Sequence, residues 1–195
     1  EFAIFQPPRY VLRMPGFPAL LALPIRLFDN SYLPARILLA CVGTSACGLV
    51  FVLGRMLFDA RVGLTAAGLA AISPILVGFS PLILSETTFA ACLLASLIGM
   101  AWMLARRGHA EAEGSTPSTR STMALCVMGL IVGSLIGLTC YVRPSWLLSA
   151  PLFGGAYVFM TPEKGRALIA AMCVVIGAVG VLVPWGLRNE RVTGH

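Results

Sequence analysis

The residues that could do chemistry in this chain are one carboxylate and several arginines that border long apolar segments. Glu86 lies in LILSETTFAACLLA, about one helical turn inside a stretch that is otherwise soluble in hydrocarbon. Arg13 occurs in RMPGFP, Arg143 in YVRPSW and Arg188 in PWGLRNER. Ionisable residues in membrane segments are costly to desolvate and often mark functional sites. Arginine also suits phosphate, because its planar fork donates two parallel hydrogen bonds.

Each of these residues also has a purely structural interpretation. A glutamate one turn from the membrane surface is not very expensive, so Glu86 could extend to the interface or pair with a neighbouring arginine for packing. Arg143 could anchor the end of a helix before Pro144. Arg188 and Arg191 could be ordinary interfacial charges. The sequence alone leaves both interpretations open.

The composition indicates the class of protein that must position these residues. Of the 195 residues, 58% are hydrophobic and 11% are charged, which is typical of a polytopic membrane protein. The net charge of +6 does not indicate nucleic-acid binding, because the basic residues are scattered among loop ends without a basic run. The six cysteines lie inside apolar stretches and lack metal-ligand spacing.

The apolar segments predict an all-α fold, a polytopic bundle of about six transmembrane helices. A helix needs roughly 20 apolar residues to cross a bilayer. The predicted spans are 37–57, 62–79, 82–105, 123–142, 145–160 and 167–187. The segment 17–28 is too short and is predicted to be an interfacial helix. Gly129, Gly133 and Gly137 form a small-residue face suited to close helix packing.

Alternating spans divide the connecting segments between two sides of the membrane. One side holds 58–61, the polar linker 106–122 and 161–166. The other holds 1–36, the turns near 80 and at 142–145, and the end from 188. The lysines and arginines are divided equally, seven on each side, so the positive-inside rule gives no orientation. Glu86 and the arginines in compact Pro- and Trp-containing contexts nevertheless share the second side.

Read in order, five segments carry a resemblance to a known family. They are RMPGFPALLAL (13–23), ARILLACVGTSACGLVFVLGRMLFDARVGLTAAGLAAISP (35–74), LILSETTFAACLLA (82–95), GLTCYVRPSWLLSAP (137–151) and PWGLRNERVTGH (184–195). The set resembles the polytopic glycosyltransferases that use polyprenyl-phosphate sugars. This is the superfamily of dolichyl-phosphate-mannose–protein mannosyltransferases and aminoarabinose transferases, which have the membrane fold called GT-C.

The resemblance implies a function and an orientation. A sugar would move from a polyprenyl-phosphate donor to a lipid, glycan or protein acceptor, in a cavity on the extracytoplasmic face of a bacterial inner membrane. Residues 1–36 and 188–195 would then be extracytoplasmic, 37–187 would hold the spans, and 106–122 would be a cytoplasmic linker. The partners would be the donor, the acceptor and membrane lipid, with no nucleic acid.

The resemblance also assigns roles to individual residues. Arg13 and Arg143 would contact the phosphate or the pyranosyl phosphate of the donor. Glu86 would be a supporting acid that either holds a divalent metal ion or orders the acceptor. Arg188, Asn189 and, with less support, Tyr10 would line the same face.

The chain departs from the family pattern at its beginning. The family has an essential Asp in a first extracytoplasmic loop, but Glu1 is the only acid before Asp29. We therefore expect the chain to be a piece of a longer enzyme, to start after that Asp, and to be inactive alone. Two other classes remain open: a transporter or flippase, and a non-catalytic membrane scaffold. Against the transporter class, the sequence shows no pair of interrupted helices in corresponding halves of the chain, which is the best sequence indicator of a transporter.

Overall fold

The computed structural model describes residues 14–28, 32–79, 82–112 and 119–193, and these residues form helices joined by short connections. The helices are α1 (Gly16–Leu27), α2 (Leu33–Leu57), α3 (Ala60–Ala71), α4 (Pro74–Phe79), α5 (Ser85–Ala112), α6 (Thr119–Val142), the 3-10 helix η1 (Pro144–Trp146), α7 (Ser149–Met160) and α8 (Lys164–Thr193). The predicted all-α class is confirmed.

The prediction of six transmembrane helices is wrong, because among the described residues only four helices are long and apolar enough to cross a membrane. They are Leu33–Leu57, Ser85–Arg106, Thr122–Val142 and Lys164–Arg191. The four helices are consistent with an integral membrane protein. The short helix α1 occupies the predicted 17–28 segment, and its position at the membrane interface stays a prediction.

The backbone is interrupted within the other two predicted spans. The segment 62–79 is divided between α3, which ends at Ala71, and α4, which begins at Pro74. A proline disfavours helical geometry in the residue before it, so a helix tends to end there. In the segment 145–160, the 3-10 helix η1 ends at Trp146 and α7 begins only at Ser149. At 12 residues each, α3 and α7 are about 18 Å long, well short of a hydrocarbon core of about 30 Å.

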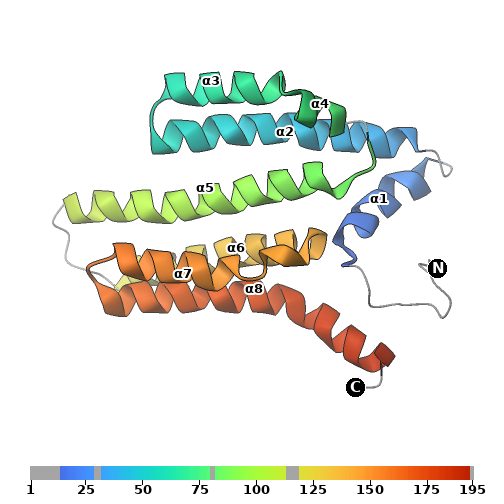
Figure 1. Ribbon diagram of the computed structural model, residues 1–195. Coiled ribbons are helices and arrows are strands. Elements are labelled where there is room, and N and C mark those ends of the chain that lie inside the picture. Colours follow the sequence, from blue (N-terminus) through green and yellow to red (C-terminus); the bar gives the residue numbers. More distant parts are fainter. Residues whose placement is uncertain (1–13, 29–31, 80–81, 113–118, 194–195) are drawn as a thin grey trace.

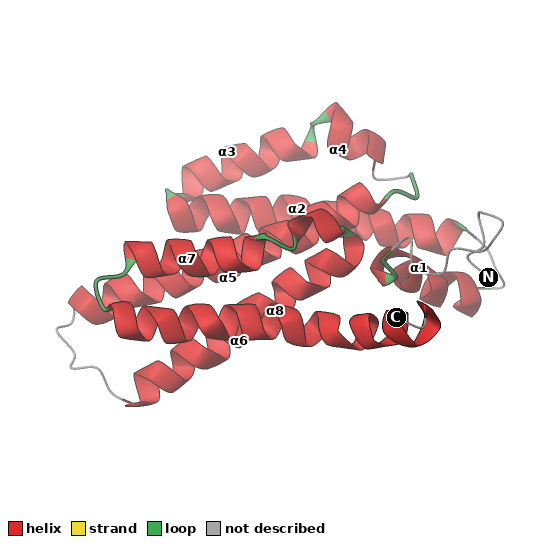
Figure 2. Cartoon of the chain, turned by 60° about the horizontal axis from the view of Figure 1, so that its bottom comes forward, coloured by secondary structure: helices red, strands yellow, loops and turns green. Residues whose placement is uncertain are grey.

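The helices form two groups that meet at α5 and α6. α2 packs against α3 and α5, whereas α8 packs against α6 and α7. Figure 1 shows α2 and α3 on one side of α5, with α6, α7 and α8 on the other, and Figure 2 shows the same bundle from a turned viewpoint. Between the groups, the fully buried Ser96 and Thr139 bring their hydroxyl oxygens to 3.4 Å of each other.

The bundle has two distinct ends. At the first, which we call the α1 end, lie α1, the beginning of α5 and the final residues of α6 and α8 (Figure 1). At the other, which we call the linker end, lie the α2–α3 turn, the end of α5, the start of α6 and the α7–α8 turn. This alternation follows the division of connecting segments that the sequence predicts, even though two of the expected spans are too short.

The closest helix contact is between α6 and α8, and glycines make it possible. A Cβ atom at Gly129 would lie 2.8 Å from the carbonyl oxygen of Ala170, and one at Gly137 would lie 2.8 Å from that of Ala178. At Gly133 a Cβ would overlap the carbonyl group of Val174. Small residues allow helix backbones to approach this closely in membranes. The predicted small-residue face is therefore confirmed.

Candidate functional site

Glu86 and Arg143, which are 57 positions apart in the chain, form an ion pair at the α1 end. The Arg143 Nη2 atom lies 3.4 Å from the Glu86 Oε1 atom. Both side chains stay partly accessible, with 37% of the Glu86 side chain and 47% of the Arg143 side chain exposed. The structure thus brings together two residues that the sequence proposed separately for the same site.

Helix ends explain why these charges are placed here. Glu86 is in the first turn of α5, where the positive end of the helix dipole favours a carboxylate. Arg143 directly follows α6, and its backbone N–H donates to the Thr139 carbonyl at 2.9 Å to close the last turn. A cation is favoured at this negative end of a helix. Two neighbouring helices therefore present opposite charges to each other.

A row of three aromatic rings begins beside the pair, and sequence reasoning did not assign them a role. The Arg143 guanidinium lies 5.5 Å from the centre of the Phe89 ring, close enough for a cation–π contact. Phe89 meets Trp146 edge-on at 6.1 Å, and Trp146 meets Phe153 edge-on at 6.0 Å. Phe89 could have been found, because a residue three positions after Glu86 shares its helix face.

Two buried polar atoms at this site have no hydrogen-bond partner among the described residues. They are Glu86 Oε2, which can accept a hydrogen bond, and Trp146 Nε1, which can donate one. Leaving such a group unsatisfied costs about 1–3 kcal/mol. The Arg143 guanidinium and the Trp146 ring both contact Phe89, and Glu86 pairs with Arg143, so this cluster offers an acceptor, a donor and a guanidinium to a polar ligand.

Arg188 and Asn189 lie farther along the α1 end, in the last turns of α8. The Arg188 guanidinium stacks 4.6 Å from the Trp185 ring on its own helix, and no described contact joins it to Glu86 or Arg143. α8 contains Pro184, and Figure 1 shows its last turns bending away from the bundle axis. A proline inside a helix is a common cause of such a bend. The proposed roles of Arg188 and Asn189 stay predictions.

Arg13 and Tyr10 lie outside the described residues. The start of α1 nevertheless reaches the end of α6, since a Cβ atom at Gly16 would lie 2.6 Å from the carbonyl oxygen of Tyr141. The Tyr141 hydroxyl in turn donates to the Val181 carbonyl at 2.8 Å, which ties α6 to α8 at this end. The chain segment that contains Gly16 thus packs within two residues of Arg143.

The described part of the site does not fit a divalent metal ion. No group of three His, Cys, Asp or Glu side chains occurs among the described residues. Glu86 already faces a guanidinium, which would repel a cation. The two roles that the resemblance implies for Glu86, holding a metal ion and ordering the acceptor, stay predictions.

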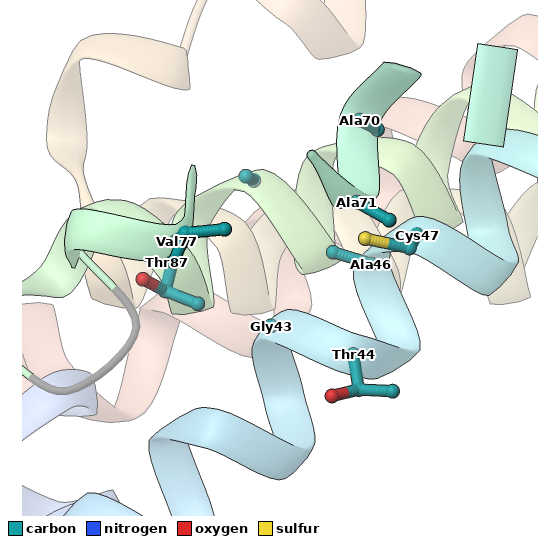
Figure 3. Close-up of a pocket in the computed structure, with 9 residues that line it drawn as sticks. Gly43, Thr44, Ala46, Cys47, Ala70, Ala71, Val77 and Thr87 are labelled. Carbon is teal, nitrogen blue, oxygen red and sulfur yellow. The ribbon is translucent and has the colours of Figure 1, made fainter. Parts of the chain in front are cut away.

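A separate apolar pocket of about 240 Å³ lies among α2, α3, α4 and α5 (Figure 3). Its walls are mostly small side chains, and they include none of the predicted site residues. Thr87 lines this pocket, whereas its neighbour Glu86 contacts Arg143. Consecutive residues of α5 thus serve two different environments, and the polar site lies outside the pocket.

Comparison with known proteins provides no relative from which a role could be transferred: no family model, no curated protein and no solved structure matches the chain.

Proposed function

We propose that this chain is the membrane part of a glycosyltransferase that moves a sugar from a polyprenyl-phosphate donor to an acceptor at the extracytoplasmic face. The observation that supports the proposal is the cluster at the α1 end: the partly exposed Arg143 guanidinium beside Glu86, with the Glu86 Oε2 and Trp146 Nε1 atoms lacking a hydrogen-bond partner among the described residues. The choice of a polyprenyl-phosphate sugar as the donor comes from the sequence resemblance, whose motifs contain Glu86 and Arg143.

The geometry of the ion pair suits an exchange of partners. A charge-assisted N–H···O bond is usually about 2.7–2.9 Å long, so the 3.4 Å contact between Arg143 and Glu86 is a loose one. The exposed guanidinium could instead donate two hydrogen bonds to the oxygen atoms of an incoming phosphate. Glu86 would then accept a hydrogen bond from the acceptor hydroxyl and orient its oxygen toward the anomeric carbon.

In the proposed reaction the acceptor oxygen forms a bond to the anomeric carbon of the sugar. The bond from that carbon to the donor phosphate oxygen breaks, and the polyprenyl phosphate leaves with the electron pair. Arg143 stabilises the charge that develops on the phosphate. The hydroxyl proton passes to a carboxylate base, a role that the resemblance gives to an Asp in the family's first extracytoplasmic loop.

The direct test is donor consumption by the natural protein. Purified protein in lipid would be incubated with a panel of polyprenyl-phosphate sugars, and release of polyprenyl phosphate would be followed by mass spectrometry. We expect release with at least one donor, and faster release when an acceptor is present. Uptake of labelled substrate into sealed vesicles, without release from any donor, would instead favour the transporter class.

Orientation gives a second, independent prediction. Gly165 in the first turn of α8 has open space around it, and Ser145 in η1 is exposed, so each can be replaced by cysteine in a variant without native cysteines. We expect Ser145→Cys to react with a membrane-impermeant maleimide on intact cells, and Gly165→Cys to react only after permeabilisation. The reverse pattern would place the Glu86–Arg143 pair in the cytoplasm and contradict the proposed donor.

A further inference from the structure

A second candidate site lies at the linker end, on the surface between α5 and α6. It is a shallow groove of about 400 Å³. It is lined by Trp102 and Arg106 from α5 and by residues of α6 that include Met123, Ala124, Val127 and Ile131. None of these residues belongs to the Glu86–Arg143 site, which is at the opposite end of the bundle.

The walls of the groove are apolar and exposed. Met123 keeps 70% of its surface accessible, Ile131 keeps 55% and Val127 keeps 49%. All three belong to the span Thr122–Val142, and Trp102 belongs to the span Ser85–Arg106. Large exposed apolar side chains on membrane-spanning helices face hydrocarbon, so the groove is placed where a lipid chain can enter it.

The charge at one end of the groove narrows the choice of lipid. Arg106 is the last residue of its apolar span, and its guanidinium lies 4.5 Å from the centre of the Trp102 ring. No carboxylate among the described side chains pairs with it. Tryptophan and arginine are typical of the membrane–water interface, where the arginine can reach lipid headgroups.

We propose that this groove binds a phospholipid with an anionic headgroup. One acyl chain lies along the apolar wall formed by α5 and α6, and the phosphate meets Arg106 where the span ends. Basic sites between transmembrane helices bind anionic headgroups by the same combination of charge and apolar surface. The site is independent of the proposed glycosyl transfer, because the donor phosphate would bind at the α1 end.

The test is competitive lipid retention, measured by native mass spectrometry. The delipidated chain in detergent would receive equal amounts of phosphatidylglycerol and phosphatidylcholine with identical acyl chains. We expect phosphatidylglycerol to be retained about fivefold better, the effect of one interfacial arginine. Arg106→Gln should bring this ratio close to one. Ala124→Phe, which fills the groove and keeps the charge, should reduce retention of both lipids.

Two control variants separate this site from general attraction to the protein. Arg61→Gln removes an exposed charge at the same end but outside the groove, and Leu168→Phe enlarges an exposed side chain on α8. Both should retain lipids like the unaltered chain. Equal retention of the two lipids by the unaltered chain, or an unchanged ratio in Arg106→Gln, would overturn the proposal. Arg106-dependent retention of added polyprenyl phosphate, but not of phosphatidylglycerol, would overturn the choice of lipid.

Discussion

Replacing Glu86 by glutamine should lower glycosyl transfer by the natural protein about 100-fold or more. Glutamine keeps the size of the side chain but removes the negative charge that would orient the acceptor hydroxyl, and misplacing a reacting group by about 1 Å can cost 100-fold in rate. The measurement is the initial rate of polyprenyl-phosphate release, with the amount of protein in the membrane determined in the same samples.

A matched control is available at the linker end of the bundle. Glu163 and Arg166 form another exposed ion pair, with 3.2 Å between Oε2 and Nη1, in the α7–α8 turn. Glu163→Gln therefore removes the same kind of charge without touching the α1 end, and its rate should stay within about twofold, since exposed pairs contribute about 0–1 kcal/mol. Near-normal turnover by Glu86→Gln would instead leave Glu86 as a packing partner of Arg143.

Arg143→Lys tests the other half of the pair. Lysine keeps the positive charge but cannot donate two parallel hydrogen bonds to one phosphate. A rate loss with this conservative change would support bidentate contact with the donor. Full activity would show that a positive charge alone is sufficient at this position.

The second large effect concerns the fold. Gly133→Leu should destabilise the bundle by at least about 2 kcal/mol, because a Cβ at this position overlaps the Val174 carbonyl group and the two helix backbones must separate. After heating in detergent, the variant should lose its monodisperse size-exclusion peak at a lower temperature than the unaltered chain. Gly180→Leu, on the partner helix α8, is the control, since nothing lies within 4 Å of a Cβ atom at Gly180.

Equal thermal stability of the two leucine variants would show that the glycine face of α6 does not hold α8. An intermediate variant, Gly133→Ala, should lie between the unaltered chain and Gly133→Leu. This order follows from the size of the overlap, so the series distinguishes backbone contact from a general effect of added apolar surface.

The sequence predicts the helical class and the sharing of one end by Glu86 and Arg143, because both depend on long apolar segments and on alternation between them. It does not predict the length of each helix correctly. Hydropathy treats 62–79 as one apolar segment, whereas the backbone is broken before Pro74. The preference of the residue before a proline for extended backbone predicts this break, and it outweighs the apolar composition of the segment.

The details of the site depend on tertiary contacts that no local pattern contains. The pairing of Glu86 with Arg143 needs the beginning of α5 to lie beside the end of α6. Trp146 was visible in YVRPSW, but its edge-on contact with Phe89 depends on the 3-10 turn after Arg143. The apolar pocket beside Thr87 depends on α3 and α4 being separate helices, which the sequence interpretation joined into one span.

The glycine contact between α6 and α8 also divides the molecule mechanically. Where backbone touches backbone, as at Gly129 and Gly137, sliding of either helix would create steric overlap, so we expect α6 and α8 to move together. Between α5 and α6, a Cβ atom at Gly99 would meet the side chain of Val132 rather than backbone. We therefore expect the contact between α5 and α6 to deform more easily than the contact between α6 and α8. The Glu86–Arg143 ion pair joins the two helix groups at the α1 end of this contact.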